Sequence, residues 1–255
     1  MTGWNFCSDN VAGASSAILE ALAMAGGGSV MPYGADPVTA RVEEKLCEIF
    51  ETDLTAYLVA TGTAANSLAL SALCPPYGSV YCHPQSHIVI DECNAPEFFT
   101  GGAKLVTVDG TDGKIDAAGL ESAISNDWAG VEHHPQPAAV SLTQASEAGT
   151  VYTPEALGAI STVCRRHELG LHMDGARFAN ALVSLGCRAA DISWRAGVDV
   201  LSFGATKNGA LAAEAVLFFR SNLAENFRFR RKRGGHLFSK MRFLSVQMDS
   251  YLTDD

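Results

Sequence analysis

Two residues that can take part in cofactor chemistry follow short apolar runs in the second half of the chain. Residues 169–173 lead into Asp174, and residues 198–203 lead through a short turn into Lys207. Apolar runs of this length that end at polar residues are typical of buried β-strands. A lysine amine can bond covalently to an aldehyde, and a carboxylate can keep a ring nitrogen protonated. The pair therefore indicates a cofactor with both an aldehyde and a basic ring, and pyridoxal 5'-phosphate (PLP) has both.

A third segment has the form of an anion-binding turn. Residues 55–60 have the pattern of a strand, and Thr61-Gly62-Thr63-Ala-Ala-Asn66 follows as a turn before a helix expected at residues 67–73. Such a turn directs free backbone N–H groups and the positive end of the helix dipole toward an anion. Gly62 lets the backbone approach closely, and Thr63 adds a hydroxyl. The same pattern also occurs in ordinary turns, so by itself it leaves both interpretations open.

Strand and helix patterns alternate along the chain, which predicts an α/β fold with a mostly parallel sheet and helices on both faces. Further strands are expected at residues 79–83, 104–109, 138–143 and 214–219, and further helices at residues 17–25, 39–50, 88–99, 115–124 and from 153 onward. Ligands of such sheets lie beyond the carboxyl ends of the strands. The segments expected at this edge are Thr61–Thr63, His87, Gln144–Glu147, Asp174–Arg177 and Lys207.

Composition excludes several classes of function. The 255 residues are 47% hydrophobic and 18% charged, which is ordinary for a protein with a sizeable core. The net charge of −10 argues against binding to nucleic acid or to an anionic membrane surface. No apolar run approaches the ~20 residues of a membrane span, and no signal peptide is visible. The seven cysteines form no C-x-x-C pair and predict reduced thiols in a cytoplasmic protein.

Several of these residues also have structural interpretations. Lys207 could instead be an ordinary surface lysine. Asp174 could be a helix cap, and Arg177 could form a structural ion pair. Cys82, His83 and His87 lie close together in sequence, but without further clustered ligands they predict no metal site. The basic run at residues 228–233 fits a nucleic-acid patch or a solvated or interface helix, and the acidic total favours the second.

Motifs along essentially the whole chain resemble those of the low-specificity L-threonine aldolases, which are fold type I PLP enzymes of the β-eliminating lyase group. In order, the motifs are Ser8-Asp9-Asn10, Tyr33-Gly34-Ala-Asp36, Thr61-Gly62-Thr63-Ala-Ala-Asn66, His87, His172-Met-Asp174-Gly-Ala-Arg177 and Thr206-Lys207-Asn-Gly209. The Asp-Gly-Ala-Arg run with the later lysine is the most specific part.

The resemblance implies a role in cofactor binding for five of these residues. Lys207 is the Schiff-base lysine, Asp174 pairs with the pyridine nitrogen, and His87 stacks on the ring. Gly62 and Thr63 hold the phosphate. Lys207, His87 and Asp174 are also the expected catalytic residues.

Three more residues receive roles at the substrate or at the neighbouring subunit. By the same resemblance, Ser8 and Arg177 bind the substrate carboxylate, and Arg177 also lies at the cofactor; a guanidinium fork suits a carboxylate well. Tyr33 is expected near the cofactor of a partner subunit, because the family builds its sites across a dimer. One branch of the family has a catalytic histidine where this chain has Ser146, so that role is not carried over.

The resemblance also sets the expected domains. We expect an N-terminal arm and helix at residues 1–28, a PLP-binding large domain at 29–240, and the start of a small C-terminal domain, largely absent from this chain, at 241–255. The implied assembly is a homo-oligomer, a dimer or tetramer.

The reaction implied by the resemblance is PLP-dependent cleavage of L-threonine, L-allo-threonine and related β-hydroxy-α-amino acids to glycine and an aldehyde. The proton of the β-hydroxyl goes to a base, and the sequence leaves open whether this base is His87 or a water held near it. The alternatives are another fold type I PLP lyase or aminotransferase, or a PLP-binding fragment with impaired catalysis.

Overall fold

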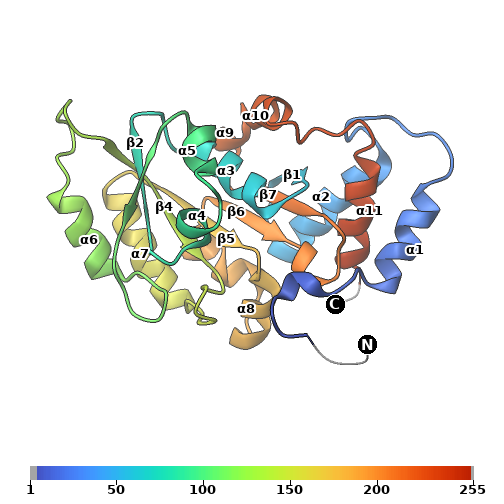
Figure 1. The fold of residues 1–255 in the computed structure, drawn as a ribbon, viewed down its shortest axis with the longest axis horizontal. Helices are drawn as coiled ribbons and strands as arrows, with labels where there is room; N and C mark the ends of the chain where they lie inside the picture. Colours follow the sequence, from blue (N-terminus) through green and yellow to red (C-terminus); the bar gives the residue numbers. More distant parts are fainter. Residues whose placement is uncertain (1–4, 254–255) are drawn as a thin grey trace.

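The expected strands form one sheet in a computed structural model, which describes residues 5–253. The strand order is β1-β7-β6-β5-β4-β2-β3 (Figure 1). The strands are β1 (Thr55–Val59), β2 (Gly78–Cys82), β3 (Lys104–Thr107), β4 (Gln136–Thr143), β5 (Gly170–Gly175), β6 (Val200–Gly204) and β7 (Glu214–Phe218). β5, which carries Asp174, is the central strand of this order.

Most strands of the sheet pair in parallel, as the sequence predicts. The pairs β3–β2, β2–β4, β4–β5 and β5–β6 are parallel, whereas β7 runs antiparallel to both β6 and β1. Only the short segment between Gly204 and Glu214 joins β6 to β7. A parallel connection needs a crossover of about a dozen residues or more, usually with a helix, so this short link returns the chain in the opposite direction.

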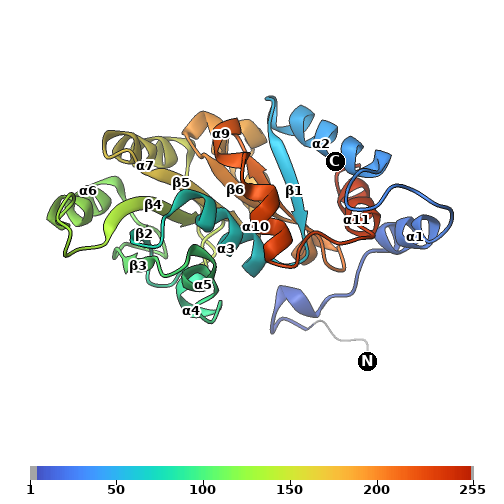
Figure 2. The same ribbon diagram turned by 90° about the horizontal axis from the view of Figure 1, so that it is seen from above.

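Helices cover both faces of the sheet, and Figure 2 shows α6 and α7 on one side and α3, α4 and α5 on the other. The helices are α1 (Ser16–Ala25), α2 (Pro37–Phe50), α3 (Gly62–Leu73), α4 (His87–Ile90), α5 (Ala95–Thr100), α6 (Ala117–Asn126), α7 (Pro154–Arg166), α8 (Phe178–Leu185), α9 (Ser221–Ala224), α10 (Phe227–Arg233) and α11 (Arg242–Tyr251). Short 3₁₀ turns are η1 (Asp9–Val11), η2 (Ala189–Ile192), η3 (Trp194–Ala196) and η4 (Thr206–Asn208). Within residues 5–253, none of the helices has the length and apolar character needed to cross a membrane.

The two faces of the sheet bury different apolar clusters because successive strand residues point to opposite sides. On β6, Val200 packs in the cluster under α3, whereas Leu201 belongs to the larger cluster of the opposite layer. Leu68 of α3 and Leu157 of α7 are 1% and 0% exposed in these two layers. Burying a leucine or valine side chain contributes about 1.5–3 kcal/mol, so both layers hold the sheet rigid beneath the site.

Helix α11 packs against α1 and α2 beyond the β1 edge of the sheet (Figures 1 and 2). Arg41 and Lys45 of α2 contact Asp249 of α11 at 2.7 and 2.8 Å, and Thr39 is hydrogen-bonded to Ser245 at 2.6 Å. The expected domain limits at 28/29 and 240/241 remain predictions, and the ends of the outer segments, residues 1–4 and 254–255, lie outside the described residues.

Several expected helices have different limits in the structure, and three of these differences have a clear local cause. Helix α3 begins at Gly62 rather than near Ser67, because the Thr61 hydroxyl caps it by accepting from the Ala64 N–H. The single helix expected at 88–99 is two short helices, because Cys93 and Asn94 have positive φ values of 50° and 60°. Helix α6 starts at residue 117 rather than 115 because Asp116 is its cap.

Candidate active site

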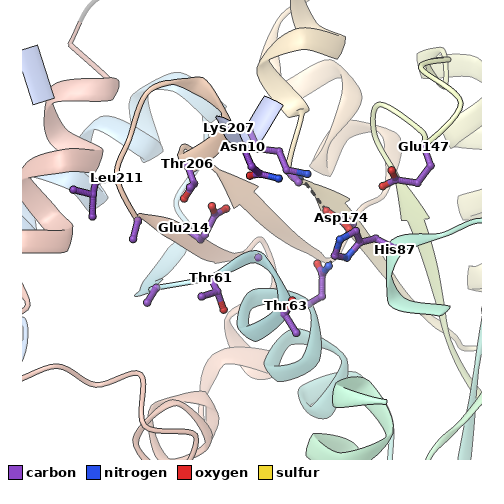
Figure 3. Close-up of a pocket in the computed structure, with 15 residues that line it drawn as sticks. Asn10, Thr61, Thr63, His87, Glu147, Asp174, Thr206, Lys207, Leu211 and Glu214 are labelled. Atoms are coloured by element: carbon purple, nitrogen blue, oxygen red, sulfur yellow. Dashed lines mark hydrogen bonds between the residues drawn. The ribbon is translucent and has the colours of Figure 1, made fainter. Parts of the chain in front are cut away.

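A cavity of about 340 Å³ opens where the carboxyl ends of β5 and β6 meet the N-terminus of α3. Five of the predicted site residues line it, and Figure 3 labels four of them, Thr63, His87, Asp174 and Lys207, among other lining residues. The five are Gly62, Thr63, His87, Asp174 and Lys207. They come from four separate elements of the chain, α3, α4, β5 and η4, and the crossovers of the sheet bring them together.

The N-terminus of α3 presents backbone donors to this cavity. The Thr61 hydroxyl accepts from the Ala64 N–H at 3.2 Å, and the Thr61 carbonyl accepts from the Ala65 N–H at 3.0 Å. The N–H groups of Gly62 and Thr63 have no acceptor within the part of the chain that the structure describes. A Cβ added at Gly62 would meet no atom within 4 Å, so the backbone there is open. The helix start therefore has two free donors for an anion.

Asp174 lies at the end of β5 with its carboxylate held in place. It is 3% exposed, and its Oδ2 accepts from Asn66 Nδ2 at 2.9 Å while its Oδ1 accepts from the Ala176 N–H at 3.0 Å. Asn66 lies one turn inside α3, so the early start of that helix brings its amide to Asp174. A carboxylate with two donors and a face toward the cavity can support a cationic ring nitrogen.

Lys207 stands on η4, just past the end of β6. Gly209 ends this turn with a φ of 101°, and its carbonyl accepts from the Ser15 N–H at 2.9 Å, which fixes the turn to the chain before α1. Residues with side chains rarely adopt such a φ, so glycine is required there. The amine of Lys207 thereby enters the cavity that the Asp174 carboxylate also lines (Figure 3).

His87 begins α4 and is hydrogen-bonded through Nδ1 to Glu92 Oε1 at 2.9 Å. This hydrogen bond raises the pKa of His87 above its ordinary value, although burial acts in the opposite direction. Burial raises the pKa of Glu92, and hydrogen bonds from His87 and Asn66 lower it in part. The sequence did not single out Glu92 or assign a role to the Asn66 side chain.

A buried histidine lies next to the site on the same strand as Asp174. His172 lies two residues earlier on β5, and its two ring nitrogens are hydrogen-bonded to Ser141 and Ser202, both at 2.9 Å. Burial lowers the pKa of His172 to about 4, so the ring is neutral near pH 7. The serines on β4 and β6 thus tie three central strands together beneath the site.

Glu214 also lines the cavity and was not predicted from the sequence. It opens β7, is 6% exposed, and faces the Thr206 hydroxyl and backbone N–H. Burial raises the pKa of Glu214 to about 7 despite those hydrogen bonds. No feature of the sequence indicated this role, because a single glutamate in an apolar strand is normally interpreted as a residue that faces solvent.

Three predicted residues do not line the cavity within this chain: Ser8, Arg177 and Tyr33. Ser8 is exposed and caps η1. Arg177 Nε contacts Asp9 Oδ2 at 2.7 Å, and its Nη1 lies 3.7 Å from Glu147 Oε2. Burial alone raises the pKa of Asp9, but hydrogen bonding and charge from Arg177, with the charge of Lys207, lower it below its ordinary value. Arg177 is therefore at the rim, next to the lining residue Glu147.

Tyr33 lies away from the cavity, on the segment that precedes α2. Its N–H donates to the Ser239 carbonyl at 3.0 Å, and the Lys232 amine is 5.2 Å from its ring centroid. The expected place near a partner's cofactor stays a prediction. Ser146 is buried and shares a 2.7 Å hydrogen bond with Thr150, which holds the loop after β4.

The groups around the cavity fit PLP. Lys207 has an amine that would bond to its aldehyde, the enclosed Asp174 has a carboxylate that would pair with its ring nitrogen, and the N–H groups of Gly62 and Thr63 are donors that would bind its phosphate. The His87 ring is available for stacking. The volume of about 340 Å³ is in the range of small-molecule sites.

Comparisons with known proteins agree on one family. A sequence model of the beta-eliminating lyase family matches residues 5–248. Low specificity L-threonine aldolases of Pseudomonas aeruginosa and a second Pseudomonas strain are 48% and 47% identical over 98% of this chain, which covers 72% and 71% of them. A threonine aldolase structure from Leishmania major superposes with a TM-score of 0.92 at 32% identity, over 99% of this chain and 73% of that one. The chain belongs to the beta-eliminating lyase family.

Proposed function

We propose that this protein cleaves L-threonine, L-allo-threonine and related β-hydroxy-α-amino acids to glycine and an aldehyde, with PLP as cofactor. The observation that carries the proposal is that Asp174 and Lys207 line one cavity with the N-terminus of α3. The names of relatives 48% and 47% identical to this chain, both low specificity L-threonine aldolases, support the reaction.

Four residues that line the cavity have roles in cofactor binding in this proposal. Lys207 would hold the cofactor covalently, Asp174 would pair with its ring nitrogen, and Gly62 and Thr63 would bind its phosphate. PLP, when bound, supplies an electron sink for the bond that breaks at the substrate α-carbon. The two N–H donors on Asp174 orient its carboxylate toward the cavity, which is the contribution of the protein to that sink.

His87 is the proposed acceptor for the β-hydroxyl proton, directly or through a water. Its Nδ1 is occupied by Glu92, so Nε2 is the nitrogen left for this proton. General-base assistance of this kind contributes about 10²–10⁴-fold in rate. Because the pKa of His87 is raised, its neutral, accepting form predominates only at a higher pH than for an ordinary histidine.

Arg177 is proposed to bind the substrate carboxylate, together with Ser8. A carboxylate that binds Arg177 replaces or joins Asp9, which holds the guanidinium at 2.7 Å in this chain. Asp9 and Ser8 lie on the same N-terminal segment, so carboxylate binding is coupled to the position of that arm. We further propose a cytoplasmic homo-oligomer, a dimer or tetramer, in which Tyr33 lies near the neighbouring cofactor.

The experiment is to incubate the protein with PLP and L-threonine and to measure glycine and acetaldehyde. Lys207→Ala is expected to abolish both turnover and the absorbance band of protein-attached PLP. Transfer of the amino group to a keto acid would instead indicate an aminotransferase, and a PLP band without turnover would indicate an impaired binding protein. Turnover and band both retained in Lys207→Ala would refute the proposed role of this lysine.

A further inference from the structure

The buried carboxylate of Glu92 connects His87 with Asp174. His87 is the residue expected to stack on the cofactor ring, and Asp174 is the residue expected to pair with the ring nitrogen. The Glu92 side chain is 0% exposed and lies in the turn between α4 and α5. Its Oε1 contacts His87 Nδ1 at 2.9 Å and Asn66 Nδ2 at 2.8 Å. Asn66 Nδ2 also donates to Asp174 Oδ2 at 2.9 Å. Glu92 thus touches His87 directly and reaches Asp174 through one amide.

The donors and acceptors of this chain of contacts are fixed by chemistry. A carboxylate oxygen only accepts, so the hydrogen of the neutral His87 ring is on Nδ1 and its lone pair is on Nε2. Asn66 has two N–H groups on one nitrogen, and each can serve one carboxylate. A neutral amide that donates to both Glu92 and Asp174 allows two acidic groups to share the site.

The burial of Glu92 argues that it does more than pack. Among the described residues, neither Glu92 Oε2 nor Asn66 Oδ1 has a hydrogen-bond partner, although both atoms are buried. Unpaired buried polar atoms cost stability and are rare in native structures. An apolar residue would fill this space without that cost, so what the carboxylate adds to the site is its charge and its hydrogen-bond acceptor.

We propose that Glu92 is a positioning residue that holds His87 as the Nδ1–H tautomer, with Nε2 free to accept the substrate proton, and that Asn66 joins the same carboxylate to Asp174. The catalytic consequence rests on the proposed function. The tautomer and the charge coupling are properties of the cofactor-free chain.

Lys207 lines the same cavity as His87, but the charged groups with the largest influence on the His87 pKa are three carboxylates. Glu92, Asp174 and Glu147 each favour the protonated ring, and Glu92 does so most strongly through its hydrogen bond. Glu92 in turn faces Asp174, which disfavours its ionisation, and His87 and Asn66, which favour it. Neutralising Glu92 therefore removes the largest single influence on the charge of His87.

The first test is a ¹⁵N-edited NMR titration of the histidine rings in the cofactor-free protein, with the His87 signals assigned by their absence in His87→Asn. The wild-type spectrum is expected to show the Nδ1–H tautomer at high pH. In Glu92→Gln the amide oxygen keeps the acceptor but loses the charge, so the pKa of His87 is expected to fall. The matched control is Asp91→Asn, which removes an exposed carboxylate beside Glu92 and is expected to leave the His87 titration nearly unchanged.

The second test is the pH profile of threonine cleavage by the same variants. Glu92→Gln is expected to move the acid limb of kcat to lower pH and to lower kcat at its plateau by about tenfold, part of the usual general-base contribution. KM is expected to change less, because Glu92 touches no substrate.

The outcomes separate this inference from the proposed function. An Nε2–H tautomer of His87 in the wild-type protein, a result that does not depend on the folding of any Glu92 variant, overturns the inference. The same follows from a His87 titration equal in Glu92→Gln and Asp91→Asn. If the titration behaves as expected but threonine is not cleaved, the proposed function fails and the positioning role of Glu92 stands.

Discussion

Glu214 provides a pH-dependent stability that can be worked out from the structure. It is 6% exposed, and burial raises its pKa from the ordinary 4.5 to about 7, against the Thr206 hydrogen bonds and the charge of Lys207. The folded protein therefore holds a proton on Glu214 between these two pKa values, whereas the unfolded chain has released it. The contribution of Glu214 to the free energy of unfolding is therefore fully present below pH 4.5. It is lost as the pH rises through about 7.

The size of the effect follows from the two pKa values. Each pKa unit corresponds to about 1.36 kcal/mol, so a rise from 4.5 to about 7 amounts to about 3.4 kcal/mol when both states are fully ionised. Between about pH 5 and pH 8 the expected loss is about 2.5 kcal/mol of unfolding free energy. This is a large share of the usual stability of a domain, about 5–15 kcal/mol.

The assay is urea unfolding of the cofactor-free protein at fixed ionic strength across this pH range. Glu214→Gln has no proton to release, so its unfolding free energy relative to wild type should increase by about 2.5 kcal/mol from about pH 5 to pH 8. Taking the difference cancels His172, which is buried neutral with a pKa of about 4 and destabilises the fold as pH falls. Exposed Glu225→Gln is the control and should run parallel to wild type. Parallel curves for Glu214→Gln and wild type would refute the reasoning.

Two further substitutions test how the site is positioned. Thr61→Ala removes the hydroxyl that accepts from the Ala64 N–H at 3.2 Å. It is expected to lower the unfolding free energy by about 1 kcal/mol in urea unfolding and to weaken PLP binding in a titration with PLP. Thr61→Ser keeps the hydroxyl and should retain both the stability and the PLP affinity. Gly175→Ala places a Cβ 2.7 Å from Leu201 Cδ1 and 2.8 Å from the Ser202 carbonyl, and is expected to destabilise the protein by about 1–3 kcal/mol in thermal unfolding; an unchanged midpoint would contradict the close packing of β5 on β6.

The sequence predicted the fold class well because apolar runs and turns repeat with a regular alternation. Strands β4, β5 and β6 lie where their apolar runs lie, and the mostly parallel sheet follows from the helices between them. The limits of α3, α4 and α5 were missed, because a threonine cap and two residues with positive φ decided them. Such local hydrogen bonds and backbone angles leave little trace in hydrophobic periodicity.

Sequence by itself determined which reactive groups this protein has and on which edge of the sheet they gather. Asp174 and Lys207 follow apolar strands, and strand ends of a parallel sheet meet at one edge. Only the tertiary structure decided which other residues, without a recognisable sequence motif, surround Asp174, Lys207 and His87. Asn66, Glu92 and Glu214 lie in α3, a turn and β7, far apart in sequence, and their roles come from burial and from hydrogen bonds across elements. A carboxylate acquires an altered pKa and a fixed partner only when folding removes water and brings a distant donor to it, and no local pattern records that event.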